Sequence, residues 1–230
     1  MRFAALATDY DGTIAHDGIV DDETIAALER VKTAGYKLLL VTGRVLPELL
    51  EVCPRVDLFD RAVVENGAVL YTPATRDTRV LAEPPPPRFA TRLHERGVTP
   101  IGTGYVIVAT FVPHEKTVAA TIAESGLPLE VIMNKDAVMV LPRGIDKAFG
   151  LNAALAELQL PAERVIGIGD AENDAPFLRR CGYSVAVANA LPDLKQAVHH
   201  VTTSARGAGV VEFVEQLLRD PDSLVQLSFR

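Results

Sequence analysis

Two carboxylates, Asp9 and Asp11, stand two residues apart directly after a strand predicted over 3–8. Side chains at this spacing in an extended segment point to the same side, so we expect the two carboxylates to share one face. Gly12 and Thr13 can then turn the chain sharply, leaving backbone N–H groups that face an anion. Paired carboxylates beside an anion site are typical of phosphoryl chemistry around a metal, with one nucleophile and one acid and base. The alternative is a polar turn after a strand, since Asp and Gly both favour turns.

A second candidate segment, Thr42-Gly43-Arg44, follows the apolar strand predicted over 37–41. The Thr42 hydroxyl and the Gly43 N–H group can bind phosphate oxygens, and glycine allows close approach. Arg44 is expected either to contact a substrate phosphate or to donate to a carbonyl group. Taken alone, the segment is more typical of a strand-to-helix cap.

Lys147 stands near the start of a helix predicted over 147–158. A lysine at that place could neutralise phosphate charge and keep a nucleophilic carboxylate ionised. Because most lysines are solvated surface residues, the residue type alone is a weak indication.

The acidic segment 167–174 follows residues 164–166 of a predicted strand and concentrates oxygen ligands of the kind that Mg²⁺ prefers. Asp170 is predicted to bind the metal directly, and Asn173 and Asp174 to complete the site directly or through water. The alternatives are a calcium-like loop and a purely structural acidic loop. The spacing does not fit an EF-hand, which needs ligands across about twelve residues and a late glutamate.

Length and composition are those of a globular protein. The chain has 230 residues, of which 48% are hydrophobic, so it can bury a sizeable core. Its formal net charge of −7 argues against a nucleic-acid partner. It allows a small phosphorylated substrate, because a bound divalent cation can supply local positive charge.

Compartment and partners follow from what the sequence lacks. The isolated cysteines Cys53 and Cys181 show no zinc or disulfide spacing. No signal-peptide pattern occurs, and no apolar run reaches membrane-spanning length. We therefore expect a cytoplasmic protein with no membrane partner, either a monomer or a homodimer.

The candidate residues stand where predicted strands end, in a chain whose strands and helices alternate. This alternation predicts a Rossmann-like doubly wound α/β fold, with a parallel sheet covered on both faces. Open sheets of this kind bind ligands at the carboxyl ends of their strands. A tight turn at Asn66-Gly67 is predicted between two of the strands. The first predicted helix is capped by Asp21 or Asp22 and ended by Gly35. The predicted strands are 3–8, 37–41, 62–65, 68–71, 164–168 and 183–187, and the other predicted helices are 46–52, 147–158, 175–180, 191–198 and 209–218.

The middle of the chain breaks this alternation. Glu83 precedes four consecutive prolines, which predict a stiff connection of the polyproline type. We interpret residues 83–142 as a small α+β cap domain, inserted into a discontinuous core of residues 1–82 and 143–230. Within the insert we predict helices over 88–97 and 114–125 and strands over 105–112, 129–133 and 137–141.

In this order, four motifs resemble those of the haloacid dehalogenase superfamily of phosphohydrolases. They are D-x-D-G-T from Asp9, V-T-G-R from Val41, G-I-D-K ending at Lys147, and G-D-x-x-N-D from Gly169. The place of the insert, with Glu65-Asn66-Gly67-Ala68 and Val187-Ala188-Asn189-Ala190, resembles the Cof-type branch, subclass IIB. The compact insert is similar to the caps of phosphoglycolate phosphatase-like and sucrose-phosphatase-like members.

The resemblance implies an Mg²⁺-dependent phosphatase that hydrolyses a small phosphate monoester, of the phosphoglycolate or sugar phosphate class, through an aspartyl phosphate. Asp9 would be the nucleophile and Asp11 the acid and base, while Thr42 and Lys147 hold the transferring phosphoryl group. The residues implied at the phosphate are Asp9, Asp11, Gly12, Thr42, Gly43, Arg44, Lys147 and Asn173. The implied metal ligands are Asp9, Asp11 through its backbone carbonyl, Asp170, Asn173 and Asp174.

Two other functions use the same residues. A phosphomutase would pass the phosphoryl group from Asp9 to a sugar hydroxyl instead of water. A non-catalytic phosphate-binding regulatory module on the same fold is the second alternative, because fold does not determine function.

Substrate choice is expected to depend on the insert. Arg88, Arg92 and Arg96 form a basic stripe at i, i+4 and i+8 on one predicted helix face. The stripe either clamps a carboxylate or second phosphate of the substrate, or it is a solvated face. Further possible substrate contacts are His94, Tyr105, His114 and Lys135.

Overall fold

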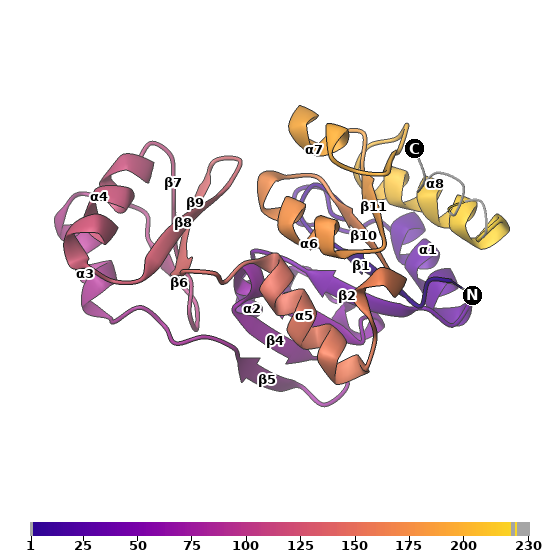
Figure 1. Cartoon of the computed structure of the whole chain (residues 1–230), viewed down its shortest axis with the longest axis horizontal. Helices are drawn as coiled ribbons and strands as arrows, with labels where there is room; N and C mark the ends of the chain where they lie inside the picture. The colour runs from indigo at the N-terminus through magenta and orange to yellow at the C-terminus, as the bar shows by residue number, and fades with distance from the viewer. Residues whose placement is uncertain (1, 222–223, 225–230) are drawn as a thin grey trace.

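The structure, a computed structural model, describes residues 2–221 and 224 and contains two β-sheets flanked by helices (Figure 1). The larger sheet consists of β1 (Ala5–Thr8), β2 (Lys37–Val41), β3 (Arg61–Val64), β4 (Val69–Thr72), β5 (Asp77–Val80), β10 (Val165–Gly169), β11 (Tyr183–Ala186) and β12 (His200–Val201). Its strand order is β12-β11-β10-β1-β2-β3-β4-β5. No helix in the described residues is both long enough and apolar enough to cross a membrane.

The strands from β12 to β3 pair in parallel, which confirms the predicted parallel core of the sheet. β3 returns as the antiparallel strand β4 through a three-residue 3-10 turn, Glu65–Gly67, in place of the predicted two-residue turn. β5, which the sequence did not predict, pairs antiparallel with β4 and forms the edge of the sheet. All four residues of β5 are exposed, so the strand lacks the apolar pattern that would have revealed it.

Helices cover both faces of this sheet. α1 (Asp22–Thr33), α2 (Leu46–Val52) and α8 (Arg206–Arg219) pack on one face, and α5 (Lys147–Leu158), α6 (Ala175–Arg180) and α7 (Pro192–Gln196) on the other. In β1, Leu6 belongs to the apolar cluster on the first face, and Ala5 and Ala7 belong to the cluster on the second. Because β1 is buried on both faces, it reads as a continuous apolar run. The doubly wound arrangement is therefore confirmed.

The smaller sheet lies between β5 and α5 in the sequence. It is antiparallel, with the order β6-β7-β9-β8. Its strands are β6 (Gly102–Thr103), β7 (Val108–Phe111), β8 (Leu129–Asn134) and β9 (Ala137–Pro142), and its helices are α3 (Arg88–Glu95) and α4 (Glu115–Ser125). The chain enters this region through the prolines between β5 and α3 and leaves it between β9 and α5.

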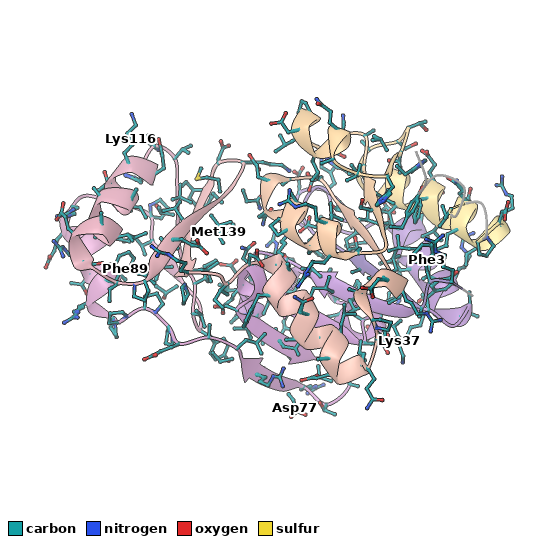
Figure 2. The ribbon with its side chains drawn as sticks, in the orientation of Figure 1. Phe3, Lys37, Asp77, Phe89, Lys116 and Met139 are labelled. Carbon is teal, nitrogen blue, oxygen red and sulfur yellow. The ribbon has the colours of Figure 1, made fainter. Side chains whose placement is uncertain are left out.

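The two faces of the smaller sheet have different neighbours. α3 and α4 lie on the side away from the larger sheet (Figure 1), where Phe89, Leu93 and Val118 form part of a separate apolar cluster. Met139 and Ile107, by contrast, belong to the apolar cluster that the larger sheet shares with α1 and α8. Figure 2 shows the positions of Phe89 and Met139 in this region. The inner face of the insert is therefore packed against the rest of the protein.

Candidate active site

The carboxyl ends of three neighbouring parallel strands bring the predicted residues together. Asp9 follows β1, Thr42 follows β2 and Asp170 follows β10. Because β1 pairs with both other strands, the three residues emerge side by side at one edge. The backbone N–H of Asp9 donates to the carbonyl of Ile168 at 2.9 Å, which extends the β1–β10 pairing to the candidate nucleophile. All three residues are buried.

Lys147 reaches the same edge from the first turn of α5. The helix is capped by Asp146, whose carboxylate accepts the N–H of Phe149 at 2.8 Å. The Lys147 side chain is 1% exposed, and its Nζ donates to Oδ1 of Asp9 and to Oδ1 of Asp174, each at 2.5 Å. The structure thus brings Lys147 to the predicted nucleophile.

Burial and neighbouring charges alter the ionisation of this group of side chains. Burial and the charge of Asp174 raise the pKa of Asp9 to about 8, against the lowering influence of Lys147. Burial by itself lowers the pKa of Lys147, but the charges of Asp174 and Asp9 raise it above its ordinary value. Lys147 is therefore charged at neutral pH. Additional positive charge beside Asp9 would lower the Asp9 pKa and keep the nucleophile ionised.

Three buried carboxylates form a candidate metal site. Oxygen atoms of Asp9, Asp170 and Asp174 all lie within 4.8 Å of one another. The 3-10 turn η4 (Glu172–Asp174) positions Asp174, whose Oδ2 accepts the N–H groups of Asp170 and Ala171 at 2.7 and 2.9 Å. This bonding holds the loop after β10 in one conformation with the carboxylates converging.

Asn173 adds an amide oxygen that has no partner. Its Nδ2 donates to Oδ1 of Asn66 at 2.9 Å, while its own Oδ1 is buried without a hydrogen bond. Leaving such an atom unsatisfied costs about 1–3 kcal/mol, so a ligand or a ligand-bound water would stabilise it. Oxygen donors in this number and of this kind fit a hard divalent cation.

Asp11, the candidate acid and base, is paired with Arg44. The guanidinium donates from Nε and Nη2 to the two carboxylate oxygens at 2.6 and 2.7 Å, which is a bidentate ion pair. The same guanidinium lies 5.6 Å from the centre of the Tyr10 ring. Arg44 therefore holds the Asp11 carboxylate in this structure. From the sequence, Arg44 was expected either at a substrate phosphate or at a carbonyl group.

The Thr42 segment forms a loop and not a helix cap. Thr42 Oγ1 accepts the N–H of Arg44 at 3.2 Å, and the Thr42 carbonyl accepts the N–H of Asn66 at 3.0 Å. α2 begins only after Val45 and has no side-chain cap. The hydroxyl hydrogen of Thr42 therefore remains available to a phosphoryl oxygen.

Gly12 makes the predicted sharp turn beside the acidic cluster. Its φ is +86°, and a Cβ atom at this position would lie 2.5 Å from Oδ2 of Asp170. Both facts require glycine. The Gly12 carbonyl accepts a hydrogen bond from Nδ2 of Asn189 at 2.8 Å. In the sequence, Asn189 was noted only as part of a motif that resembles the family.

Glu65 was not predicted as a site residue, although it was part of a quoted motif. Its side chain is fully buried. Its Oε1 accepts the N–H of Tyr105 at 2.7 Å, and its Oε2 accepts those of Val106 and Ile107 at 2.8 and 3.0 Å. These N–H groups belong to the loop between β6 and β7. Charge-assisted bonds of this kind are stronger than neutral ones, so Glu65 fastens the insert to the larger sheet.

Glu65→Gln is expected to loosen this loop. The amide keeps the shape of the side chain but turns an N–H₂ group toward backbone N–H donors. We expect amide hydrogen exchange at residues 105–107 to accelerate at least about tenfold, measured by mass spectrometry. Exposed Glu163→Gln is the matched control. Equal protection in both variants would show that the carboxylate does not hold the loop.

Two residues of the basic stripe, Arg92 in α3 and Arg96 directly after it, form ion pairs within the insert. Arg92 Nη2 lies 2.9 Å from a carboxylate oxygen of Glu124 in α4, and Arg96 also bonds to Glu124. Arg96 donates in addition to Oγ1 of Thr121 at 3.1 Å. Both helices lie on the side of the smaller sheet away from the larger one, which favours the interpretation of the stripe as a solvated, ion-paired face.

Known proteins are similar to this chain in sequence. Residues 6–95 and 121–214 match the family described as haloacid dehalogenase-like hydrolase. A phosphoglycolate phosphatase of Methanothermobacter thermautotrophicus is 30% identical over 220 residues, which cover 93% of this chain and 98% of the relative. A phosphoglycolate phosphatase of Aeropyrum pernix is 29% identical over 228 residues, which cover 95% of this chain and 94% of the relative.

Solved structures resemble the fold over nearly its whole length. A crystal structure of a Thermoplasma acidophilum protein has a TM-score of 0.81 at 18% identity, covering 94% of this chain and 98% of that one. A sugar phosphatase of haloacid dehalogenase subclass IIB has a TM-score of 0.76 at 20% identity, covering 95% of this chain and 99% of that one. At these identities the likeness concerns the fold.

Proposed function

Since this chain belongs to the haloacid dehalogenase-like hydrolases and is a phosphatase of that superfamily, we propose that it hydrolyses a small monoester of the phosphoglycolate class through an aspartyl phosphate on Asp9, with Mg²⁺ as its metal. Sugar phosphates are the second substrate class. The observation that carries the proposal is the burial of Asp9 between Lys147 and the carboxylates of Asp170 and Asp174. A buried carboxylate with one fixed cation beside it is suited to attack on an anionic group.

Two displacements at phosphorus make up the reaction. In the first, a carboxylate oxygen of Asp9 attacks phosphorus, the bond to the ester oxygen breaks, and Asp11 gives a proton to the departing alkoxide. In the second, Asp11 takes a proton from a water molecule whose oxygen attacks the aspartyl phosphate, which releases phosphate and restores the Asp9 carboxylate. Splitting the reaction replaces one difficult step with two easier ones.

The remaining residues hold the phosphoryl group and its charge. The Thr42 hydroxyl and the Gly43 N–H donate to phosphoryl oxygens, and Lys147 neutralises charge that develops on them. When held by Asp9, Asp170 and Asp174, with Asn173 and the Asp11 carbonyl supporting, the metal supplies positive charge that offsets repulsion between the nucleophile and the phosphate. To act as the acid of the first step, Asp11 leaves Arg44, takes up a proton from solvent and turns toward the leaving group; the second step returns this proton to Asp11 from the attacking water.

The region from 83 to 142 is proposed to act as a cap over this site, on a core formed by residues 1–82 and 143–230. Its own sheet and apolar cluster, and its attachment through two connections, support this division. The relatives that carry the name phosphoglycolate phosphatase support a small carboxylated ester as the substrate. We also propose a monomer or homodimer in the cytoplasm, where the free buried thiols of Cys53 and Cys181 would stay reduced.

Phosphate release from a panel of small esters tests the function. We expect release in the presence of Mg²⁺ and none in the presence of a chelator, with phosphoglycolate hydrolysed best. Measurement of isomer formation on hexose phosphates runs beside it. Isomer formation without phosphate release would identify a phosphomutase and contradict the proposal.

Asp170→Asn is expected to raise the Mg²⁺ concentration needed for half-maximal activity at least about tenfold, because a charged oxygen ligand is lost. Isothermal titration with Mg²⁺ should show the same loss of affinity without any substrate. Asp193→Asn, an exposed change on α7, is the control. An unchanged metal titration in Asp170→Asn would place the metal elsewhere.

A further inference from the structure

One cation of the insert reaches the acidic cluster of the core. Lys135 stands in the turn between β8 and β9, and its Nζ lies 2.6 Å from Oδ2 of Asp170. Its backbone N–H donates to Oε2 of Glu172 at 3.2 Å. Among the ion pairs found in the described residues, Lys135–Asp170 is the one that joins the insert to the core. The turn is therefore docked on the loop that follows β10.

The Lys135 ammonium also lies beside the predicted anion-binding turn. A Cβ atom at Gly12 would be only 2.9 Å from Lys135 Nζ. Two apolar side chains of the same hairpin, Ile132 and Met139, pack with the apolar cluster of the core. A Cβ atom at Gly43 would lie 3.3 Å from Sδ of Met139, which places apolar side chains over the phosphate-binding loop. Lys135 thus brings a positive charge to a part of the insert that also contacts the core through apolar side chains.

The partners of the three cations at the site differ. Lys147 bonds to both Asp9 and Asp174, and Arg44 bonds to Asp11 through two hydrogen bonds. Lys135 has one acidic partner, Asp170, which is also a proposed metal ligand. A cation bound by Asp170 would take that carboxylate and repel the ammonium. Lys135 would then need another anion, and an ester bound between Asp9 and the insert could supply one from its leaving group.

We propose that Lys135 is the specificity-determining residue of the insert and binds a second anionic group, a carboxylate, on the leaving-group side of the substrate. This inference rests on the proposed function and deepens it. Lys135 selects phosphate esters that carry a carboxylate over esters whose leaving group is an uncharged alcohol. Only the carboxylated esters supply its ammonium group with an anionic partner in place of Asp170.

Two esters that differ in the relevant group test the inference. Phosphoglycolate carries a carboxylate where 2-hydroxyethyl phosphate carries a hydroxymethyl group. We expect Lys135→Met to lower the ratio of kcat/KM for phosphoglycolate to that for 2-hydroxyethyl phosphate about 30-fold, mainly through KM for phosphoglycolate. Lys135→Arg should restore part of the ratio, since it returns the charge.

Metal binding supplies a readout that does not depend on turnover. Without substrate, Lys135→Met should bind Mg²⁺ at least about threefold more tightly in isothermal titration, because no ammonium competes for Asp170. Lys116→Met on α4 is the matched control. Figure 2 shows Lys116 on α4, where its exposed side chain projects outward from the upper edge of the insert. This control should change neither the ester ratio nor the metal affinity.

The outcomes separate the two proposals. If wild-type protein hydrolyses both esters and Lys135→Met leaves their ratio unchanged, the specificity role is overturned while the phosphatase function stands. If wild-type protein hydrolyses sugar phosphates but neither of these esters, this inference is overturned while the phosphatase function stands. If it hydrolyses no ester of the panel with Mg²⁺, the proposed function fails and this inference fails with it. A fall in the ratio together with tighter metal binding supports both.

Discussion

Asp9→Asn should abolish phosphate release, by at least about a thousandfold in kcat, while the protein remains folded. A carboxamide oxygen is a poor nucleophile, so no aspartyl phosphate can form. The amide has the same shape as the carboxylate, and Asp174 remains as a partner for Lys147. Single-turnover release of phosphate from phosphoglycolate measures the effect.

The same variant makes a prediction about stability in the absence of metal. Burial beside Asp174 raises the pKa of Asp9 to about 8, whereas an unfolded chain has the ordinary value of 3.8. Between these values the folded state holds a proton that the unfolded state has lost, so wild-type stability falls as pH rises from about 4 to 8. Asn carries no charge and escapes this loss. The difference in Tm between Asp9→Asn and wild type should therefore grow in favour of the variant over this range, measured with a chelator present.

Asp77→Asn is the matched control for both measurements, because Asp77 is exposed on the edge strand β5 (Figure 2). It should retain full activity and the wild-type dependence of Tm on pH. Retained turnover in Asp9→Asn would show that Asp9 is not the nucleophile. A Tm difference that does not change with pH would show that Asp9 is not protonated in the metal-free protein.

Lys147→Met is expected to lower kcat about a thousandfold and to destabilise the protein. The variant removes the cation that stands 2.5 Å from both Asp9 and Asp174. Removing one partner of a buried ion pair typically costs about 3–5 kcal/mol, because the other charge is left uncompensated. Loss of a fixed positive charge beside the transferring phosphoryl group accounts for the fall in kcat.

Urea unfolding with and without Mg²⁺ distinguishes the two effects of this substitution. Added Mg²⁺ should recover part of the lost free energy of unfolding, since it returns positive charge to the same carboxylates. Its effect on kcat should be much smaller, because the position of the ammonium is not restored. Lys116→Met serves again as the control. Stability and kcat equal to wild type in Lys147→Met would contradict the assigned role, and Lys147→Arg provides a charged variant if the methionine variant does not fold.

Prediction of the fold succeeded where local pattern and tertiary environment agree. β1 and β2 are buried apolar runs, and Asp21 caps α1 by accepting the N–H of Thr24. A short stretch of sequence is therefore enough to predict each of these elements. The edge strand β5 is exposed throughout, and the two-residue strand β6 carries too few residues for a pattern. Their strand conformation comes from pairing with neighbours.

In the candidate site, too, the sequence indicates residues but not their long-range partners. Glu65 was visible within a motif, but its role depends on three N–H groups some forty positions later in the chain. Arg44 was expected at a phosphate or a carbonyl group, and the structure pairs it with Asp11. Long-range partners of this kind have no signature in the spacing of nearby residues.

By itself, the sequence predicted the candidate residues and placed Asp9, Thr42 and Asp170 where apolar strands end, because residue type, apolar runs and turn residues are local properties. Only the tertiary structure decided how the charges are paired: Lys147 with Asp9 and Asp174, and Lys135 with Asp170. These pairings depend on the order of strands in the sheet and on the docking of the insert. Burial then sets their strength, since charges removed from water interact strongly only with the partners that packing places beside them.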